Sequence, residues 1–153
     1  MKVRDLMTTD LKVCTPDTTV AEAAHLLWQG DCGMLPVVDD GELAGVVTDR
    51  DMFIALGTRN ARAAGLRVGA VSSRHVATCA PDDSIETALA TMREARVHRL
   101  PVVGNDGTLR GVLSTNDLVR AAGADRGVAP DEVLRTLQEI CGPKQLAPRG
   151  AAA

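Results

Sequence analysis

The sequence predicts an α/β fold (α+β): two tandem β-α-β-β-α repeats packed against each other, followed by a short C-terminal helix. Three observations predict it. The tetrapeptide LPVV occurs at 35–38 and again at 100–103, an offset of 65 residues. Before the tetrapeptide, further identical residues recur at the same offset of 65. After it, identical residues recur at an offset of 66. Within each copy, apolar residues first follow the spacing of a helix and then form short runs typical of strands.

The matched residues occur in the same order in both copies. A single residue inserted in a turn explains the change of offset, and we expect the copies to span roughly 7–60 and 71–124. The pairs are Cys14 with Cys79, Pro16 with Pro81, Asp17 with Asp82, Ala23 with Ala88, Asp40 with Asp106, Gly41 with Gly107, Leu43 with Leu109, Gly45 with Gly111, Val46 with Val112 and Asp51 with Asp117.

Each copy is expected to form a β-α-β-β-α unit. A short extended piece ends at a proline, which disfavours helix in the residue before it. A helix follows, then two apolar strands joined by Asp-Gly, which is a hairpin signal, and then a second helix. In the first copy we expect the extended piece at 12–15, the helix at 17–29, the strands at 35–38 and 43–47, and the second helix from near Thr48. In the second copy we expect the extended piece at 76–80, the helix at 82–95, the strands at 100–103 and 109–113, and the second helix from near Ser114. Neither copy buries enough surface alone, so the two must pack together.

The remaining residues are expected to connect and follow the repeats. Residues 57–70 are rich in Gly, Ala and Arg, which predicts a linker or a loose helix. Pro130 suits a first helical turn, an apolar stripe follows it, and Gly142-Pro143 ends the helix. The expected segments are a first repeat at 1–60, a linker at 61–70, a second repeat at 71–124, a C-terminal helix at 125–142 and a flexible tail at 143–153.

The composition disfavours several classes of protein. The net charge is −3 with scattered Arg and Lys, and Trp28 and Phe53 are the only aromatic residues, so binding of nucleic acid is not expected. No apolar run is long enough to span a membrane, and the first residues lack the apolar segment of a secretory signal. We therefore expect a cytoplasmic protein with reduced thiols. The four Cys and three His residues do not group, so no metal site is expected.

Two matched segments, GVVTDRD and GVLSTND, carry the candidate chemistry and end at Asp51 and Asp117. Where a strand ends and a helix begins, free backbone N–H groups and the positive end of the helix dipole favour an anion. Thr48 or Ser114 adds a hydroxyl that can donate to a phosphate oxygen, and the aspartate can accept from the two neighbouring hydroxyls of a ribose. The same spacing is that of a capping box, which needs no ligand. Its recurrence at equivalent points of a duplicated unit favours binding.

This ordered set of elements, present twice, resembles a tandem pair of cystathionine β-synthase (CBS) domains, a Bateman module, over about residues 5–122. The shared elements are the early proline, the LPVV strand, the Asp-Gly hairpin and the G-h-h-[ST]-x-x-D segment. Through VCTPDTT (13–19) and EICGP (139–143) the chain is also similar to small stand-alone actinobacterial hypoxic-response proteins. The resemblance implies that the two repeats pack with pseudo-two-fold symmetry and leave two clefts between them. These clefts are expected to bind AMP, ADP, ATP or S-adenosylmethionine, with no cofactor required.

The resemblance also assigns residues to these clefts: the aspartate to ribose, the hydroxyl to phosphate, and neighbours of the first two strands to the cleft walls. The candidate ligand-binding residues are Thr15, Pro36, Thr48, Arg50, Asp51, Thr78, His98, Arg99, Pro101, Ser114 and Asp117. The second copy has His98-Arg99 where the first has Gly33-Met34. A guanidinium can bind a phosphate through two donors, so we expect unequal clefts, one better suited to phosphates. A surface salt bridge for Arg99 and a surface position for His98 are the alternatives.

The cysteines suggest a second feature. Cys14 and Cys79 occupy equivalent strand positions, where a thiol packs as a small apolar group. If the terminal helix folds back over the first strand, Cys141 meets Cys14, and a reversible disulfide between them would pin the helix. Separate reduced thiols are the alternative.

We expect a non-catalytic sensor in which an adenine nucleotide bound between the repeats shifts the shape of the module or its self-association. Its expected partners are a second copy, forming a homodimer, and an unidentified protein. The alternative is an interaction or scaffold protein of the same fold without a ligand, responding to redox state through Cys14 and Cys141. An enzyme is disfavoured because the sequence offers no nucleophile with a nearby base and no carboxylate dyad.

Overall fold

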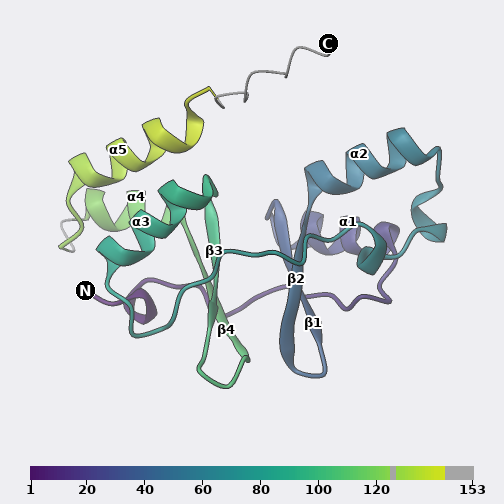
Figure 1. The fold of residues 1–153 in the computed structure, drawn as a ribbon, viewed down its shortest axis with the longest axis horizontal. Helices are drawn as coiled ribbons and strands as arrows, with labels where there is room; N and C mark the ends of the chain where they lie inside the picture. The colour runs from purple at the N-terminus through teal and green to yellow at the C-terminus, as the bar shows by residue number, and fades with distance from the viewer. Residues whose placement is uncertain (125–126, 144–153) are drawn as a thin grey trace, which may run out of the picture.

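Two α/β halves lie side by side in the computed structural model, each with a hairpin beside the junction and helices outside it (Figure 1). The structure describes residues 1–124 and 127–143, so the tail expected at 143–153 lies outside the described residues beyond Pro143. With η for a 3-10 helix, the elements are η1 (Val3–Asp5), α1 (Val20–Gln29), β1 (Met34–Asp39), β2 (Glu42–Thr48), α2 (Asp49–Arg59), η2 (Ala63–Gly65), η3 (Val68–Ala70), α3 (Ile85–Ala95), β3 (Arg99–Val103), β4 (Leu109–Ser114), α4 (Thr115–Gly123) and α5 (Pro130–Cys141).

An antiparallel hairpin forms the centre of each half, β1–β2 in the first repeat and β3–β4 in the second. Asp40 and Gly41 turn the first hairpin with φ of 46° and 85°, the left-handed conformation that a two-residue turn of this kind requires. The extended piece expected before each first helix is present. Cys14 and Cys79 each pair in parallel with the first strand of the hairpin that follows. The fold class and its repeated unit are therefore as predicted.

The helices begin where a side chain caps them. Thr19 and Ser84 accept the backbone N–H three residues ahead, at 3.2 and 3.1 Å, so α1 and α3 begin at Val20 and Ile85. These starts lie three residues later than the expected 17 and 82, because the acidic and hydroxyl residues before them form a turn and a cap. The second helix of each repeat begins directly after its capping hydroxyl residue, as predicted.

The segment leading into each repeat crosses to the other repeat. Thr8 pairs with Val112 on β4, and Ser73, which lies 65 residues after Thr8, pairs with Val46 on β2. Thr8 and Val112 exchange both backbone hydrogen bonds, at 2.9 and 3.0 Å, as do Ser73 and Val46, at 2.9 and 3.0 Å. The two repeats therefore exchange equivalent strands, and each crossing strand covers the open edge of a hairpin.

The same exchange completes the two apolar cores. Val3 and Val68 are fully buried, Val3 in the cluster of the second repeat and Val68 in that of the first. Val68 falls within the stretch expected as a linker, which is therefore packed. Asp82 holds the first residues in place by accepting from Lys2 at 2.8 Å and Arg4 at 2.5 Å. The hydrogen bond from Lys2 and the charge of Arg4 keep the pKa of the Asp82 carboxyl below its ordinary value.

Helix α5 begins at Pro130, the residue expected in its first turn, and ends at Cys141, so it is shorter than the segment 125–142 assigned to it; it packs on α3 and α4 of the second repeat (Figure 1). Val133 and Ile140 are buried in the core of that repeat. Arg93 on α3 donates to the Thr136 hydroxyl at 2.9 Å. Because α5 stays on the second repeat, it does not fold over the first strand of the first one.

Glycines in the repeated motif permit the strand exchange. A Cβ on Gly45 would lie 2.6 Å from the carbonyl oxygen of Ser73, and one on Gly111 would lie 2.8 Å from that of Thr8. Neither distance is compatible with a side chain. The glycine of each motif is therefore required by the crossing backbone.

We predict that Gly45→Ala lowers the free energy of unfolding by about 1–3 kcal/mol, because the added methyl must push the crossing strand away from β2. Urea denaturation measures the change. Gly57→Ala is the control: Gly57 lies in α2 with nothing within 4 Å of its added Cβ. That substitution should leave stability unchanged or raise it by up to about 1 kcal/mol through helix propensity. Equal stability of Gly45→Ala and the parent protein would refute the role of the close approach.

Candidate functional site

Asp51 and Asp117 cap the helices in which they lie. The Oδ2 atom of Asp117 accepts from the backbone N–H of Ser114 at 2.9 Å and from its hydroxyl at 2.6 Å. Asp51 accepts from the same groups of Thr48 at 3.1 and 2.7 Å. Each hydroxyl oxygen accepts the backbone N–H of its aspartate in return, at 3.3 Å from Asp117 and 3.1 Å from Asp51. Both motifs are therefore capping boxes.

Capping uses only one oxygen of each carboxylate. The other oxygen of Asp117, Oδ1, accepts from Nη2 of Arg120 at 2.6 Å. Within the described part of the chain, Oδ1 of Asp51 accepts no hydrogen bond. A carboxylate can accept about four hydrogen bonds, so a capping aspartate can still bind a ligand group. Capping and binding are thus compatible roles of the same side chain.

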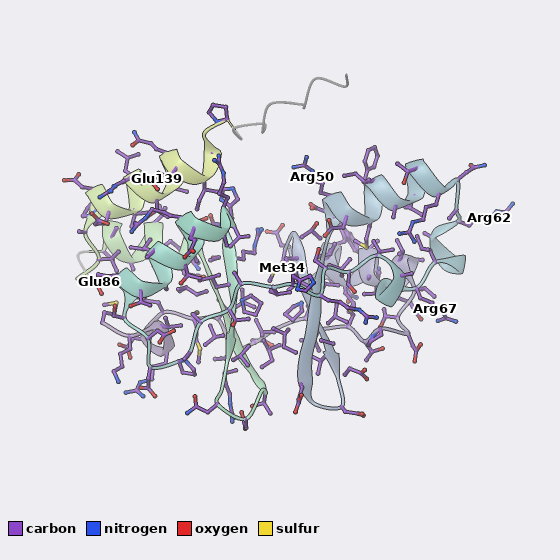
Figure 2. The ribbon with its side chains drawn as sticks, in the orientation of Figure 1. Met34, Arg50, Arg62, Arg67, Glu86 and Glu139 are labelled. Atoms are coloured by element: carbon purple, nitrogen blue, oxygen red, sulfur yellow. The ribbon has the colours of Figure 1, made fainter. Side chains whose placement is uncertain are left out.

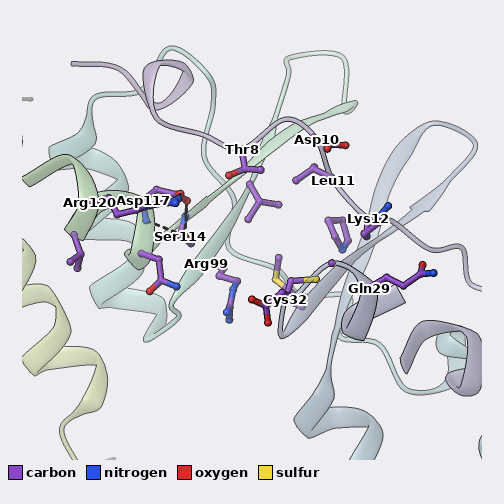
Figure 3. A pocket seen from close by; sticks show the side chains of 17 residues that line it. Thr8, Asp10, Leu11, Lys12, Gln29, Cys32, Arg99, Ser114, Asp117 and Arg120 are labelled. Carbon is purple, nitrogen blue, oxygen red and sulfur yellow. Dashed lines mark hydrogen bonds and ion pairs between the residues drawn. The ribbon is translucent and has the colours of Figure 1, made fainter. Parts of the chain in front are cut away.

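A cavity of about 860 Å³ opens between the two repeats on the side of Asp117. Figure 3 shows Asp117 and Arg120 on one wall, Lys12 and Cys32 on the opposite wall, and Arg99 between them. The walls also include the rest of the crossing segment, the loop after α1, and parts of β1 and β4. Both repeats therefore contribute to one cavity of a size that suits a small molecule.

The cavity brings together part of the candidate set. Pro36, Arg99, Ser114 and Asp117 line it. The other candidates do not, and they are Thr15, Thr48, Arg50, Asp51, Thr78, His98 and Pro101. Thr15, Thr78, His98 and Arg50 are exposed, and the Thr15 hydroxyl lies 3.2 Å from that of Thr18 in its own turn. A site at Asp51 would accordingly lie outside this cavity.

Several lining residues were not among the sequence candidates. The crossing segment supplies Thr8 and Lys12, and α4 supplies Arg120. A signal for the crossing segment exists, since Lys2-Val3 recurs as Arg67-Val68 at the offset of 65. Conservative substitutions outside the expected repeat boundaries obscure it.

Arg99 and its equivalent Met34 face the same cavity, although the sequence suggested that they serve different clefts. Figure 2 shows Met34 at the junction of the two halves. The Arg99 guanidinium forms no hydrogen bond or salt bridge with the described residues, so the expected alternative of a surface salt bridge is not seen there. Its Nη2 atom lies 3.7 Å from where a Cβ on Gly33 would be. Its donors are therefore available to an anion in the cavity.

The structure favours one of the two alternatives for Cys14 and Cys141. Both are separate free thiols, and no disulfide joins them. Cys14 is buried in the first repeat with its Sγ 3.7 Å from the carbonyl oxygen of Pro36, whereas Cys141 is exposed at the end of α5 on the second repeat. The pairing was expected on the assumption that α5 covers the first strand of the first repeat, and the helix instead packs on α3 and α4.

Two further findings concern the described residues as a set. None of their helices has both the length and the apolar character needed to cross a membrane. They also contain no group of three His, Cys, Asp or Glu side chains arranged to hold a metal ion.

The sequence matches the family model of the CBS domain at residues 3–58 and 68–124, and both matches begin at the buried valine of a crossing segment. The CBS domain-containing protein YhcV of Bacillus subtilis is 35% identical over 116 residues, which cover 76% of this chain and 81% of that protein. Inosine-5'-monophosphate dehydrogenase of Mycobacterium leprae is 34% identical over 116 residues, but these cover only 21% of the enzyme.

Solved structures share the fold over most of the chain. CBSX2 of Arabidopsis thaliana in complex with AMP has a TM-score of 0.71 and 34% identity, covering 82% of this chain and 98% of that one. Hypoxic Response Protein I with two coordinated zinc ions has a TM-score of 0.72 and 27% identity, covering 78% and 98%. Both the tandem-pair resemblance and the similarity to a hypoxic-response protein are confirmed.

We predict that Cys14 and Cys79 resist thiol reagents in the native protein. Burial raises the pKa of the Cys14 thiol to about 11 and that of Cys79 to about 12, so little thiolate forms near pH 8. Titration with a chromogenic disulfide at pH 8 should label the exposed Cys141 rapidly and these two only after unfolding. Cys141→Ser should remove the share of Cys141 from the fast phase and leave that of Cys32, which is partly exposed in the wall of the cavity. Fast native labelling of Cys14 would contradict its burial.

Proposed function

Because the chain belongs to the CBS domain family, we propose that it is a non-catalytic sensor that binds an adenosine-containing ligand in the cavity between its repeats. One observation carries the proposal. The cavity is lined both by a carboxylate held in place by its own cap, Asp117, and by a guanidinium without a protein partner in the described chain, Arg99. The AMP bound to the similar CBSX2 supports it.

In the proposed binding mode each chemical group of the ligand meets a matching protein group. The ribose hydroxyls donate to Oδ1 of Asp117, and the Ser114 hydroxyl lies near a phosphate. Arg99 binds the phosphate through two N–H donors, and Lys12 adds a positive charge from the opposite wall. Pro36 on β1 offers an apolar surface to the base. These groups favour AMP, ADP or ATP over S-adenosylmethionine, whose sulfonium is a cation.

Ligand binding would act by bridging the repeats, since both contribute walls of the cavity. A ligand shifts an equilibrium between two arrangements only by its difference in affinity for them. The output would then pass to a protein partner or to a second copy. The dehydrogenase activity of the matched enzyme does not transfer to this chain, because the match covers only the CBS portion.

Self-association forms the second part of the proposal, with α1 and α2 as the contact of a homodimer. Trp28 on α1 and Phe53 on α2 are 79% and 80% exposed, and they are the only aromatic residues of the chain. The residue equivalent to Trp28 is Arg93, and α5 covers it, leaving its side chain 20% exposed. The outer helix face of the second repeat is thus occupied by α5. Within the described chain no helix covers the matching face of the first repeat, which suits a second copy.

For the binding site, we predict that Asp117→Ala weakens AMP binding more than tenfold, because it removes the acceptor of the ribose hydroxyls. Glu22→Ala is a matched control. Glu22 is also the carboxylate of a capping box, on α1, but it does not line the cavity. Both substitutions should lower stability by removing a cap, yet only the first should change affinity. Titration calorimetry with AMP, ATP and S-adenosylmethionine measures both. If no ligand binds the parent protein, the ligand-free scaffold is favoured.

For the assembly, we predict that Trp28→Glu and Phe53→Glu convert a dimer into a monomer, since each buries a charge in the contact. Sedimentation velocity should give the parent protein a mass of twice 16.1 kDa. Leu134→Glu is the control, because Leu134 is 57% exposed on α5, away from α1 and α2. A monomeric parent protein, or dimers that survive both substitutions, would rule out this contact.

A further inference from the structure

Arg120 occupies the carboxylate oxygen that the proposed ligand needs. Its Nη2 atom donates to Oδ1 of Asp117 at 2.6 Å, while Oδ2 is committed to the cap. The two partners differ sharply in burial, since Asp117 is 8% exposed and the Arg120 side chain 77% exposed. The aspartate is therefore fixed, and the arginine is the partner that can move.

The Arg120–Asp117 pair also borders two cavities. Both residues line the cavity between the repeats and a second one of about 300 Å³, whose wall includes Asp5 and Leu6. Figure 3 shows Arg120 and Asp117 together at one end of the first cavity. The guanidinium has room on either side of the carboxylate. Rotation of Arg120 would leave Oδ1 facing the ligand without moving the backbone.

The first repeat lacks this arrangement. Ile54 stands at the position equivalent to Arg120, and it follows Asp51 by the same three residues. An isoleucine cannot pair with a carboxylate, and Oδ1 of Asp51 has no hydrogen-bond donor among the described residues. The ion pair is thus a feature added to one copy of a duplicated motif rather than a requirement of the helix start.

We propose that Arg120 is a specificity-determining residue that makes the Asp117 site select anionic nucleotides over neutral nucleosides. The inference rests on the proposed function, because it concerns the same carboxylate. Oδ1 has two acceptor sites, so a ribose that donates both of its hydroxyls to this oxygen displaces Arg120 and loses the ion pair. A phosphate on the ligand offers the displaced guanidinium a new charged acceptor and recovers the interaction. Adenosine has no phosphate to accept from the displaced guanidinium, so its binding loses the Arg120–Asp117 ion pair without a replacement.

The test compares adenosine with AMP by titration calorimetry on the full chain. Arg120→Met removes the competing donor and keeps an unbranched apolar stem. Adenosine should then bind about two- to fivefold more tightly, as expected for release of an exposed ion pair. AMP should bind more weakly, so that the ratio of the two affinities falls about tenfold. Arg120→Lys should give an intermediate ratio.

Arg110→Met is the matched control. Arg110 pairs with Asp106 at 2.7 Å and its side chain is 51% exposed, but it lies on the β3–β4 hairpin and does not line either cavity. The control variant loses the same positive charge, and its ratio of AMP affinity to adenosine affinity should equal that of the parent protein. Binding of both ligands with an unchanged ratio in Arg120→Met overturns the role of Arg120 and leaves the site intact. Absence of binding in every variant and in the parent protein overturns the proposed function as well.

Discussion

Backbone pairing between each leading segment and the hairpin of the other repeat is the constraint on which the rest of this structure depends. A two-stranded hairpin alone is marginally stable, and its open edge invites pairing with other chains. The crossing strands at Thr8 and Ser73 cover these edges, and Val3 and Val68 fill the two cores. The first crossing segment continues to Lys12 and becomes a wall of the cavity. The strand exchange therefore builds the cavity as well as the fold.

The two interpretations of the aspartate motif, a helix cap and a ligand group, turn out to be compatible. The cap fixes the rotamer of Asp117 and so presents its second oxygen in one orientation, which reduces the entropy lost when a ligand binds. Glu22 shows that a capping box alone is not a site, because its carboxylate is held in the same way on a surface without the cavity. Asp117 differs from Glu22 because the other repeat lies across the cavity from it. This arrangement depends on the tertiary fold and not on the local capping motif.

Much of the fold could be predicted from the sequence because its signals are local. Pro130 and Gly142-Pro143 delimit α5, and the Asp-Gly pair marks the first hairpin. The crossing segments could not be predicted in the same way, because each makes only isolated bridges to residues distant in the sequence and retains little identity between copies. Whether Cys141 meets Cys14 depends on where α5 packs. An apolar stripe indicates that one face of a helix is buried, but it does not indicate which element covers that face.

Because the two repeats share one backbone fold, a side chain can differ between equivalent positions without a change in the fold of the other repeat. Equivalent positions share a backbone setting, so a difference between copies acts through the side chain alone. Four such positions carry an apolar residue in the first repeat and an arginine in the second, namely Trp28 and Arg93, Met34 and Arg99, Ala44 and Arg110, and Ile54 and Arg120. An arginine can bind an anion or fix a helix, whereas an exposed apolar residue gains free energy only when another surface covers it. Under the proposed function, this division assigns anion binding to the second repeat and self-association to the first. Under the same proposal, a ligand that alters the junction of the repeats would also alter the surface proposed for assembly, because the crossing strands join the two repeats.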